Sequence, residues 1–119
     1  AHDFCVISLS DRLTSWEVIE TRLACAARGD FALALYNPSS KGRPDYLQKA
    51  VRILRANGKT PETVCGIVRN IGREGQEKRV LTLAELEKTQ VDMFTTVFIG
   101  NAATRELAGR MVTPRGYKR

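Results

Sequence analysis

Reactive and metal-binding residue types are scarce in this sequence. It has one histidine, His2, and three widely spaced cysteines, Cys5, Cys25 and Cys65, which form no CxxC pair. A Ser/His/Asp triad and a His/Cys metal site therefore have no support, and we expect no metal. We interpret the cysteines as small buried residues of a protein from a reducing compartment, which favours a cytoplasmic location.

Long apolar runs are also absent. No stretch approaches the roughly 20 consecutive apolar residues that a membrane-spanning helix needs, so we expect no membrane partner. The length of 119 residues fits one domain with one core. The first expected strand begins at Phe4, with almost nothing before it and no initiator methionine. We therefore expect this chain to be a piece of a longer one.

The sequence has fewer acidic than basic residues. The 19 lysines and arginines against 13 aspartates and glutamates give a net charge of +6. This excess favours a polyanionic partner, either nucleic acid, acidic lipid or a small polycarboxylate or phosphate ligand; a merely basic solvated surface is the alternative. Aromatic residues make up only 7% of the chain, and no RNA-binding motif is present. A nucleic-acid-binding module is therefore a less favoured alternative, and a dimerisation module without catalysis is a third interpretation.

Apolar periodicity and turn residues predict alternating strands and helices. The expected strands are 4–9, 31–36, 63–68, 77–81 and 95–99. Helices are expected after Thr14, Pro44 and Thr82 and should end near Gly29, Asn57 and Thr89. Capping boxes are expected at Thr14 and Thr82, with hydrophobic staples of Leu13 with Val18 and of Leu81 with Leu86. A short helical turn over 102–110 and a mobile basic tail over 113–119 complete the prediction.

This order of elements predicts a three-layer α/β domain with a mixed, mostly parallel five-stranded sheet flanked by helices. The near-continuous apolar strand 31–36 indicates burial on both faces. The long helical connections suit right-handed crossovers between parallel strands. The link between the third and fourth strands has no obvious helix, which predicts an antiparallel pair there.

Polar, glycine-rich or proline-rich segments follow three of the strands. Tyr36 ends the second strand and Asn37 follows it, the segment 72–75 follows the third, and Gly100-Asn101 follows the fifth. Open α/β sheets bind ligands at such strand ends, so these segments predict one shared cleft. Tyr36 could pack against a flat ligand, and Asn37 offers both a donor and an acceptor. Plain turns between elements are the alternative.

Charged and hydroxyl side chains lie near the same strand ends. Lys41, Arg43, Arg69 and Arg73 could form a clamp for a carboxylate or phosphate, or could be scattered surface charge. Ser8, Ser10 and Asp11 follow the first strand and are further candidates for substrate contact, although Asp11 could simply fix a turn. No catalytic residue can be assigned. The chain therefore reads as part of a binding cleft and not as a self-contained catalytic unit.

Several ordered motifs together resemble one enzyme family. They lie at 3–11, 34–41, 66–75, 91–101 and 112–117, so the resemblance runs over almost the whole chain. The family is precorrin-3B C(17)-methyltransferase of cobalamin biosynthesis, within the tetrapyrrole methylases. The resemblance implies an S-adenosylmethionine-dependent enzyme that methylates carbon 17 of a precorrin and contracts its ring. It also implies a homodimer when full-length.

In this family the cofactor and the tetrapyrrole lie between two α/β domains. The chain resembles only the C-terminal domain, because the Gly-rich loop of the N-terminal domain is absent from residues 1–119, and catalysis would need that missing domain. By resemblance, Tyr36 and Asn37 lie beside the methionine part of S-adenosylmethionine. Ile71, Gly72 and Arg73 match the segment that reads adenine, and Thr95, Thr96 and Val97 match a strand that lines the adenosine pocket. The substrate candidates remain Ser8, Ser10, Asp11, Lys41 and Arg43.

Overall fold

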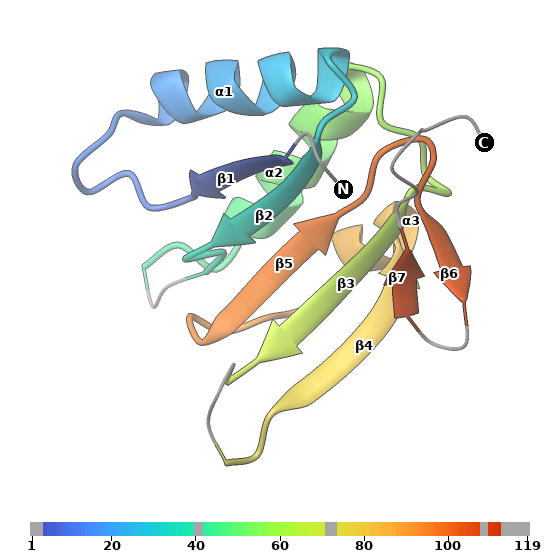
Figure 1. Ribbon diagram of the computed structural model, residues 1–119. Coiled ribbons are helices and arrows are strands. Elements are labelled where there is room, and N and C mark those ends of the chain that lie inside the picture. Colours follow the sequence, from blue (N-terminus) through green and yellow to red (C-terminus); the bar gives the residue numbers. More distant parts are fainter. Residues whose placement is uncertain (1–3, 40–41, 71–73, 108–109, 113–119) are drawn as a thin grey trace.

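Five strands and three helices follow one another much as the sequence predicts, and a small hairpin follows them. A computed structural model describes residues 4–39, 42–70, 74–107 and 110–112 (Figure 1). The elements are β1 (Phe4–Ser8), α1 (Trp16–Arg28), β2 (Ala32–Tyr36), α2 (Tyr46–Ala56), β3 (Val64–Arg69), β4 (Glu77–Thr82), α3 (Leu83–Glu87), β5 (Thr95–Ile99), β6 (Arg105–Leu107) and β7 (Arg110–Val112). Among the described residues, no helix is both long enough and apolar enough to cross a membrane.

The five-stranded sheet is mixed, with strand order β1-β2-β5-β3-β4. The α/β class is therefore confirmed, and so is the antiparallel pairing of β3 with β4. The expectation of a mostly parallel sheet is wrong, because only β1 and β2 pair in parallel. β5 runs antiparallel to both of its neighbours, β2 and β3. Apolar alternation identifies a strand but carries no information about its direction, which is why the sequence did not reveal this.

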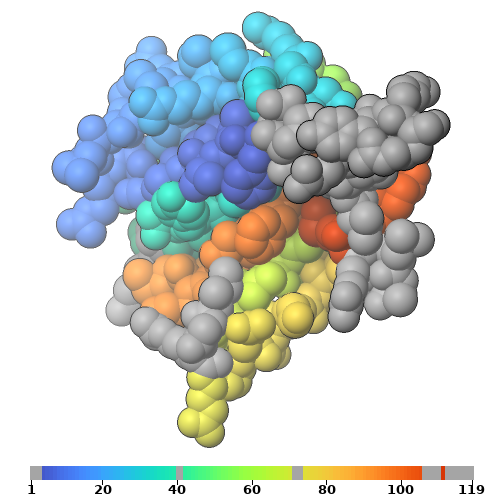
Figure 2. Space-filling view, in the orientation of Figure 1, coloured from blue at the N-terminus to red at the C-terminus, as the bar shows by residue number. Residues whose placement is uncertain are grey.

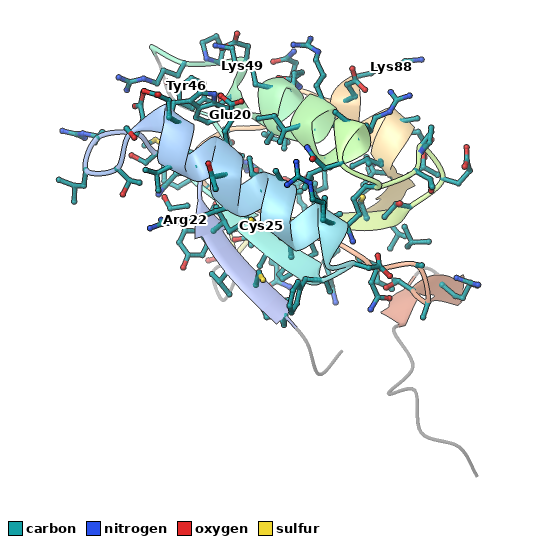
Figure 3. The ribbon with its side chains drawn as sticks, turned by 90° about the horizontal axis from the view of Figure 1, so that it is seen from above. Glu20, Arg22, Cys25, Tyr46, Lys49 and Lys88 are labelled. Atoms are coloured by element: carbon teal, nitrogen blue, oxygen red, sulfur yellow. The ribbon has the colours of Figure 1, made fainter. Side chains whose placement is uncertain are left out.

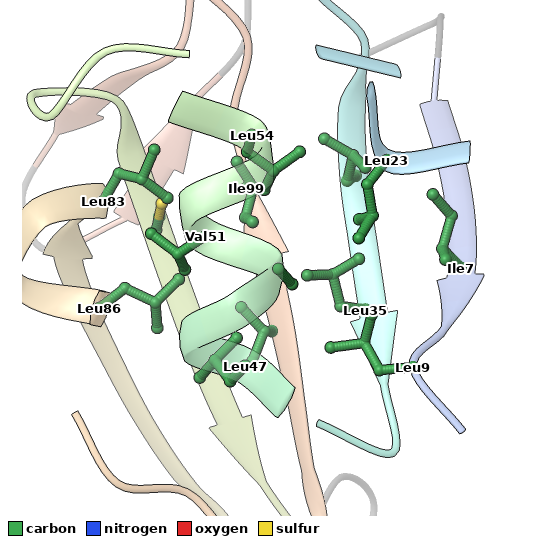
Figure 4. Close-up of a cluster of buried hydrophobic side chains, with 14 of the residues drawn as sticks. Ile7, Leu9, Leu23, Leu35, Leu47, Val51, Leu54, Leu83, Leu86 and Ile99 are labelled. Carbon is green, nitrogen blue, oxygen red and sulfur yellow. The ribbon is translucent and has the colours of Figure 1, made fainter. Parts of the chain in front are cut away.

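All three helices pack on one face of this sheet. Leu33 and Leu35 of β2 and Val97 and Ile99 of β5 point toward them and are buried. Figure 4 shows side chains of α2 and α3 meeting the strand side chains in this core. The apolar residues of α1 and α2 recur at helical spacing, and the buried ones are Ile19, Leu23, Ala26, Ala27, Leu47, Ala50, Val51 and Leu54. The described helices form one layer on the sheet, so the expected three-layer arrangement is not observed.

The two predicted capping boxes have different outcomes. At α3, Thr82 Oγ1 accepts a hydrogen bond from Glu85 N at 3.2 Å, and Glu85 Oε1 accepts one from Thr82 N at 2.8 Å, as predicted. At α1 the cap is Ser15 instead of Thr14, and Ser15 Oγ accepts from Val18 N. The predicted staple at α1 is wrong as well, because Leu13 is fully exposed.

The cysteines are free thiols in three different environments. Cys65 lies in the core, and burial raises its pKa to about 12, so this thiol stays neutral and unreactive at neutral pH. Cys5 is half-buried, whereas Cys25 is exposed on α1 (Figure 3). The expectation that all three are buried is therefore wrong for Cys25.

None of the helices that the structure describes covers the second face of the sheet. Figure 2 shows parts of the strands on this face. Phe4 and Val6, which alternate along β1 with Cys5 and the buried Ile7, are about half exposed. The hairpin β6–β7 lies against β3 here and replaces the helical turn predicted over 102–110. A Cβ atom at Gly66 would lie 2.8 Å from Met111 Sδ, so the lack of a side chain at Gly66 makes room for the methionine. A tertiary contact thus overrides the local helix preference of this segment.

A buried lysine fastens one edge of the sheet. Lys59 follows α2, is 4% exposed, and donates through Nζ to the carbonyl oxygens of Phe31 and Gly100 at 2.7 and 2.8 Å. Its third partner is the carboxylate of Asp30 at 3.3 Å, which also accepts from the backbone N–H of Ala102. Burial lowers the pKa of Lys59, and Asp30 partly opposes that shift. One ammonium group therefore joins the starts of β2 and β3 to the end of β5.

We expect Lys59→Met to lower the free energy of unfolding by about 3 kcal/mol, because it leaves two buried carbonyl groups without a donor. Urea unfolding followed by circular dichroism measures this. The control is Lys88→Met, since Lys88 is exposed and its loss should change stability by less than about 0.5 kcal/mol. Equal effects of the two substitutions would contradict the role of Lys59.

Candidate functional site

The sheet topology brings several predicted site residues to one edge. β1, β2 and β3 all end there and β5 begins there, because Ser8 pairs with Tyr36 and Arg69 pairs with Thr95. Gly100 lies at the opposite edge, where its backbone N–H bonds the carbonyl of Val64. The sequence analysis is therefore correct in bringing the ends of β2 and β3 to one edge and wrong in including the end of β5, and the end of β1, with the candidate Ser8, joins that edge.

Two asparagines, directly after β2 and β3, turn the chain away from the sheet at this edge. Asn37 and Asn70 have φ angles of 54° and 57°, in the left-handed region that asparagine tolerates better than most residues. Asn37 Nδ2 donates to Ser8 Oγ at 3.0 Å, which ties the end of β2 to the end of β1. Asn70 N donates to the carbonyl of Phe94 at 3.1 Å, which ties β3 to the segment before β5.

Asp11 holds a cluster beside the end of β1. The hydroxyl of Tyr46 donates to Asp11 Oδ2 at 2.6 Å, and Arg43 Nε lies 3.0 Å from Asp11 Oδ1. The Tyr46 ring packs on Trp16 with a centroid separation of 4.6 Å. The hydrogen bond to Asp11 is the main cause of a raised pKa at Tyr46, and burial adds to it. Two predicted substrate residues, Asp11 and Arg43, thus pair with each other, and Tyr46 is a member that the sequence did not reveal.

A second aspartate organises the entrance to β5. Asp92 Oδ2 accepts from Arg69 Nε at 2.6 Å, and Asp92 Oδ1 accepts from Phe94 N at 2.9 Å and Thr95 Oγ1 at 3.1 Å. Arg69 also lies 3.5 Å from Glu77. The pKa of Asp92 is lowered, mainly because Arg69 donates to its charged form.

The predicted cationic clamp is not assembled by the described residues. Arg43 and Arg69 are each held by a carboxylate, and they line different hollows of the surface. Lys41 and Arg73 lie outside the described residues, as do Ile71 and Gly72 of the predicted adenine segment.

The remaining predicted cofactor residues divide between the two faces of the sheet. Tyr36 is exposed at the end of β2, and Thr96 points to the face that the helices leave open. Thr95 and Val97 point to the helix side and are buried, and Val97 belongs to the core. Only Tyr36, Asn37 and Thr96 of the described candidates therefore present a side chain that a ligand could reach.

Two hollows open beside the end of β1. The Tyr46 hollow has a volume of about 280 Å³ and is lined by Leu9, Ser10, Arg12, Asn37, Ser39, Arg43, Tyr46 and Met93. The Ser8 hollow measures about 520 Å³ and is lined by Ser8, Ser10, Arg12, Leu13, Thr14, Arg22 and Asn37. Because Ser10, Arg12 and Asn37 line both hollows, the two are adjacent parts of one binding surface. Arg12 and Arg22 are functional candidates that the sequence analysis missed.

This fold is that of methyltransferases that act on tetrapyrroles. Uroporphyrin-III C-methyl transferase from Thermus thermophilus, solved with S-adenosylhomocysteine, matches 84% of the chain and 42% of its own length, with a TM-score of 0.62 and 19% identity. The crystal structure of the methyltransferase CobJ matches 95% of the chain and 47% of its own length, with a TM-score of 0.83 and 42% identity. No family model matches the chain.

Two of the curated relatives are named for methylation at the same carbon, C(17). The chain is 46% identical over 116 residues to a probable cobalt-factor III C(17)-methyltransferase of Salmonella typhimurium. It is 45% identical over 122 residues to a precorrin-3B C(17)-methyltransferase of a Sinorhizobium species. Each match covers 98% of this chain but only 48% and 47% of the relative. The family resemblance is thus confirmed, and the chain spans about half the length of the curated relatives it matches.

Stability should depend on pH through Asp92. Its pKa in the folded state lies below its ordinary value of 3.8, so its contribution is complete above that value and disappears as the pH falls through the folded-state pKa. The side chains of Arg69 and Asp92 are 43% and 41% exposed, which limits this contribution to about 1 kcal/mol. We expect Asp92→Asn to be less stable than wild type near neutral pH by about that amount, with the gap shrinking as the pH falls below 3.8 and through the lowered pKa of Asp92. Urea unfolding near neutral pH and over a series of descending acid pH values measures the gap, and a gap that does not shrink in acid would contradict the assignment.

Proposed function

We propose that this chain is the C-terminal half of an S-adenosylmethionine-dependent C(17)-methyltransferase of cobalamin biosynthesis. The observation that carries the proposal is the match of 98% of the chain, at 46% and 45% identity, to two relatives named for transfer to that carbon. The two names differ in the state of the macrocycle, cobalt-factor III or precorrin-3B, and the nearly equal identities favour neither. The proposal includes the ring contraction that accompanies methylation in the family.

S-adenosylmethionine is the proposed methyl donor, and the edge where β1, β2 and β3 end is its proposed site. The complex of the Thermus thermophilus neighbour with S-adenosylhomocysteine supports the choice of cofactor. Tyr36, Asn37 and Thr96 are the described residues that would contact it. A methyl group on a sulfonium is already activated, so the protein can contribute chiefly by holding donor and acceptor carbon in line. The described residues would orient the reactants, and we assign no catalytic acid or base.

The other half of the enzyme is the proposed partner of this edge. The curated relatives are about twice as long as the chain, which supports a missing N-terminal domain that closes the cleft. We also propose that the full-length enzyme is a cytoplasmic homodimer. The free thiols of Cys5, Cys25 and Cys65 support a reducing compartment, and the half-exposed Phe4 and Val6 offer surface for a subunit contact.

The charge-based alternative, a nucleic-acid-binding module, is not favoured. Several of the cations that would form a basic surface are engaged by carboxylates, including Arg43, Arg55 and Arg69. The matched relatives are methyltransferases along almost the whole chain. Salt-sensitive binding of a generic oligonucleotide, with no response to S-adenosylhomocysteine in calorimetry, would instead favour that alternative.

A chimaera tests the proposed function directly. This chain replaces the matching half of the Salmonella typhimurium relative, and methyl transfer from labelled S-adenosylmethionine to the macrocycle is measured. We expect the chimaera to transfer methyl groups, with the intact relative as the positive control, and we expect the isolated chain to transfer none. A folded but inactive chimaera would contradict the assignment of this half. Methyl transfer by the isolated chain would contradict the proposal that catalysis needs the N-terminal domain.

Thr96→Trp should block cofactor binding in that chimaera without unfolding it, because the indole would occupy the open face beside Val68 at the proposed cleft. We expect at least a tenfold loss of affinity for S-adenosylhomocysteine, about 1.4 kcal/mol, by calorimetry. Lys88→Trp is the control, since Lys88 is exposed at the end of α3 on the helix side of the sheet and lines no part of the proposed cleft. Unchanged affinity in Thr96→Trp would place the cofactor elsewhere.

A further inference from the structure

Among the residues that the structure describes, the polar lining of the Ser8 hollow consists of side chains with hydrogen-bond donors and includes no acidic residue. Its charged side chains are the guanidinium groups of Arg12, from the segment after β1, and Arg22, from α1. Its other polar side chains are those of Ser8, Ser10, Thr14 and Asn37. The hollow lined by Arg69 differs, because it also contains Glu77 and Asp92. A lining with two cations and without a carboxylate has the chemistry of an anion receptor.

The serine hydroxyl groups are oriented by the bonds that they accept. Ser8 Oγ accepts from Asn37 Nδ2 at 3.0 Å and from Ser10 N at 3.3 Å. Ser10 Oγ accepts from Arg12 N at 3.4 Å. A hydroxyl oxygen has two lone pairs and one hydrogen, so Ser8 has used its capacity to accept and its O–H can only donate. The two bonds that Ser8 accepts thus leave its hydroxyl as a donor for an acceptor that enters the hollow, and Ser10, which accepts one bond, can also donate.

The two arginines of this hollow differ from the other arginines at the same edge of the sheet. Arg43 lies 3.0 Å from Asp11, and Arg69 lies 2.6 Å from Asp92. No ion pair is formed by Arg12 or Arg22 with the residues that the structure describes. Figure 3 shows Arg22 and Tyr46 on opposite sides of α1.

We propose that Arg12 and Arg22 form a subsite that binds a carboxylate side chain of the tetrapyrrole. The inference rests on the proposed function, because it names residues for the substrate of that same cleft. Guanidinium groups bind carboxylates through paired N–H donors, and the hydroxyl groups of Ser8 and Ser10 add two further donors. The fully exposed Leu13 at the hollow gives an apolar surface for the hydrocarbon that carries the carboxylate. The amino-acid carboxylate of S-adenosylmethionine is the other source of the same group, and the test separates the two.

The test measures binding of uroporphyrin, a tetrapyrrole rich in carboxylates, to this chain by fluorescence titration. We expect Arg12→Gln and Arg22→Gln each to weaken binding about tenfold, since each removes one charge-assisted contact. Arg28→Gln is the matched control, because Arg28 is exposed on the same helix as Arg22 and does not line the hollow. The affinity of this variant for uroporphyrin should stay within twofold of wild type. Mesoporphyrin, which has fewer carboxylates on a similar ring, should respond less to the two substitutions. Circular dichroism checks that every variant is folded.

Four outcomes would overturn the subsite. They are no binding of uroporphyrin by the wild-type chain, wild-type affinity in both hollow variants, an equal loss in Arg28→Gln, or a loss of affinity for S-adenosylhomocysteine in place of uroporphyrin. None of these outcomes bears on methyl transfer by the chimaera, so failure of the subsite is distinguishable from failure of the proposed function.

Discussion

The ammonium group of Lys59 is the interaction on which the arrangement of this domain depends. It lies inside the protein between the turn before β2, the connection from α2 to β3 and the end of β5, and its three hydrogen bonds go to Asp30, Phe31 and Gly100. A buried cation is tolerated only when its donors are satisfied, and here two backbone carbonyls and one carboxylate satisfy them. Residues from distant parts of the chain must therefore be in place together before the lysine can be buried.

The two edges of the sheet consequently have different roles. The edge at Lys59 is closed by backbone and side-chain bonds, whereas the opposite edge ends in polar residues that reach into surface hollows. At that second edge, Asp11 and Asp92 each neutralise one arginine and fix one loop. The rigid parts of the proposed cleft are built from these ion pairs, and the remaining donors around Ser8 are left for a ligand. The ion pairs that stabilise this edge and the donors proposed to bind a ligand are thus formed by different residues of the same surface.

Local patterns in the sequence were sufficient for the elements and their inward faces, because periodicity reports directly which side of a helix is apolar. The box at Thr82 was predictable since Glu85 stands three residues later. At Thr14 and Ser15 two adjacent hydroxyl residues compete, and the spacing to Glu17 selected the wrong one. Lys59 gave no signal, because a lysine between Gly58 and Thr60 has the composition of a solvated loop. The Ser8 hollow was equally hidden, since Arg22 approaches Ser8 only when α1 packs on the sheet.

The position of β5 has a consequence for how the chain acquires its structure. β5 lies between β2 and β3, so the strand at the centre of the sheet is contributed by residues 95–99, long after both neighbours. Leu33 must pair with Ile99, and Cys65 must pair with the same residue from the other side. Such distant pairings raise the contact order, which slows folding. During synthesis, β2 and β3 emerge with their inner edges unpaired, and the sheet can close only when nearly the whole domain has left the ribosome.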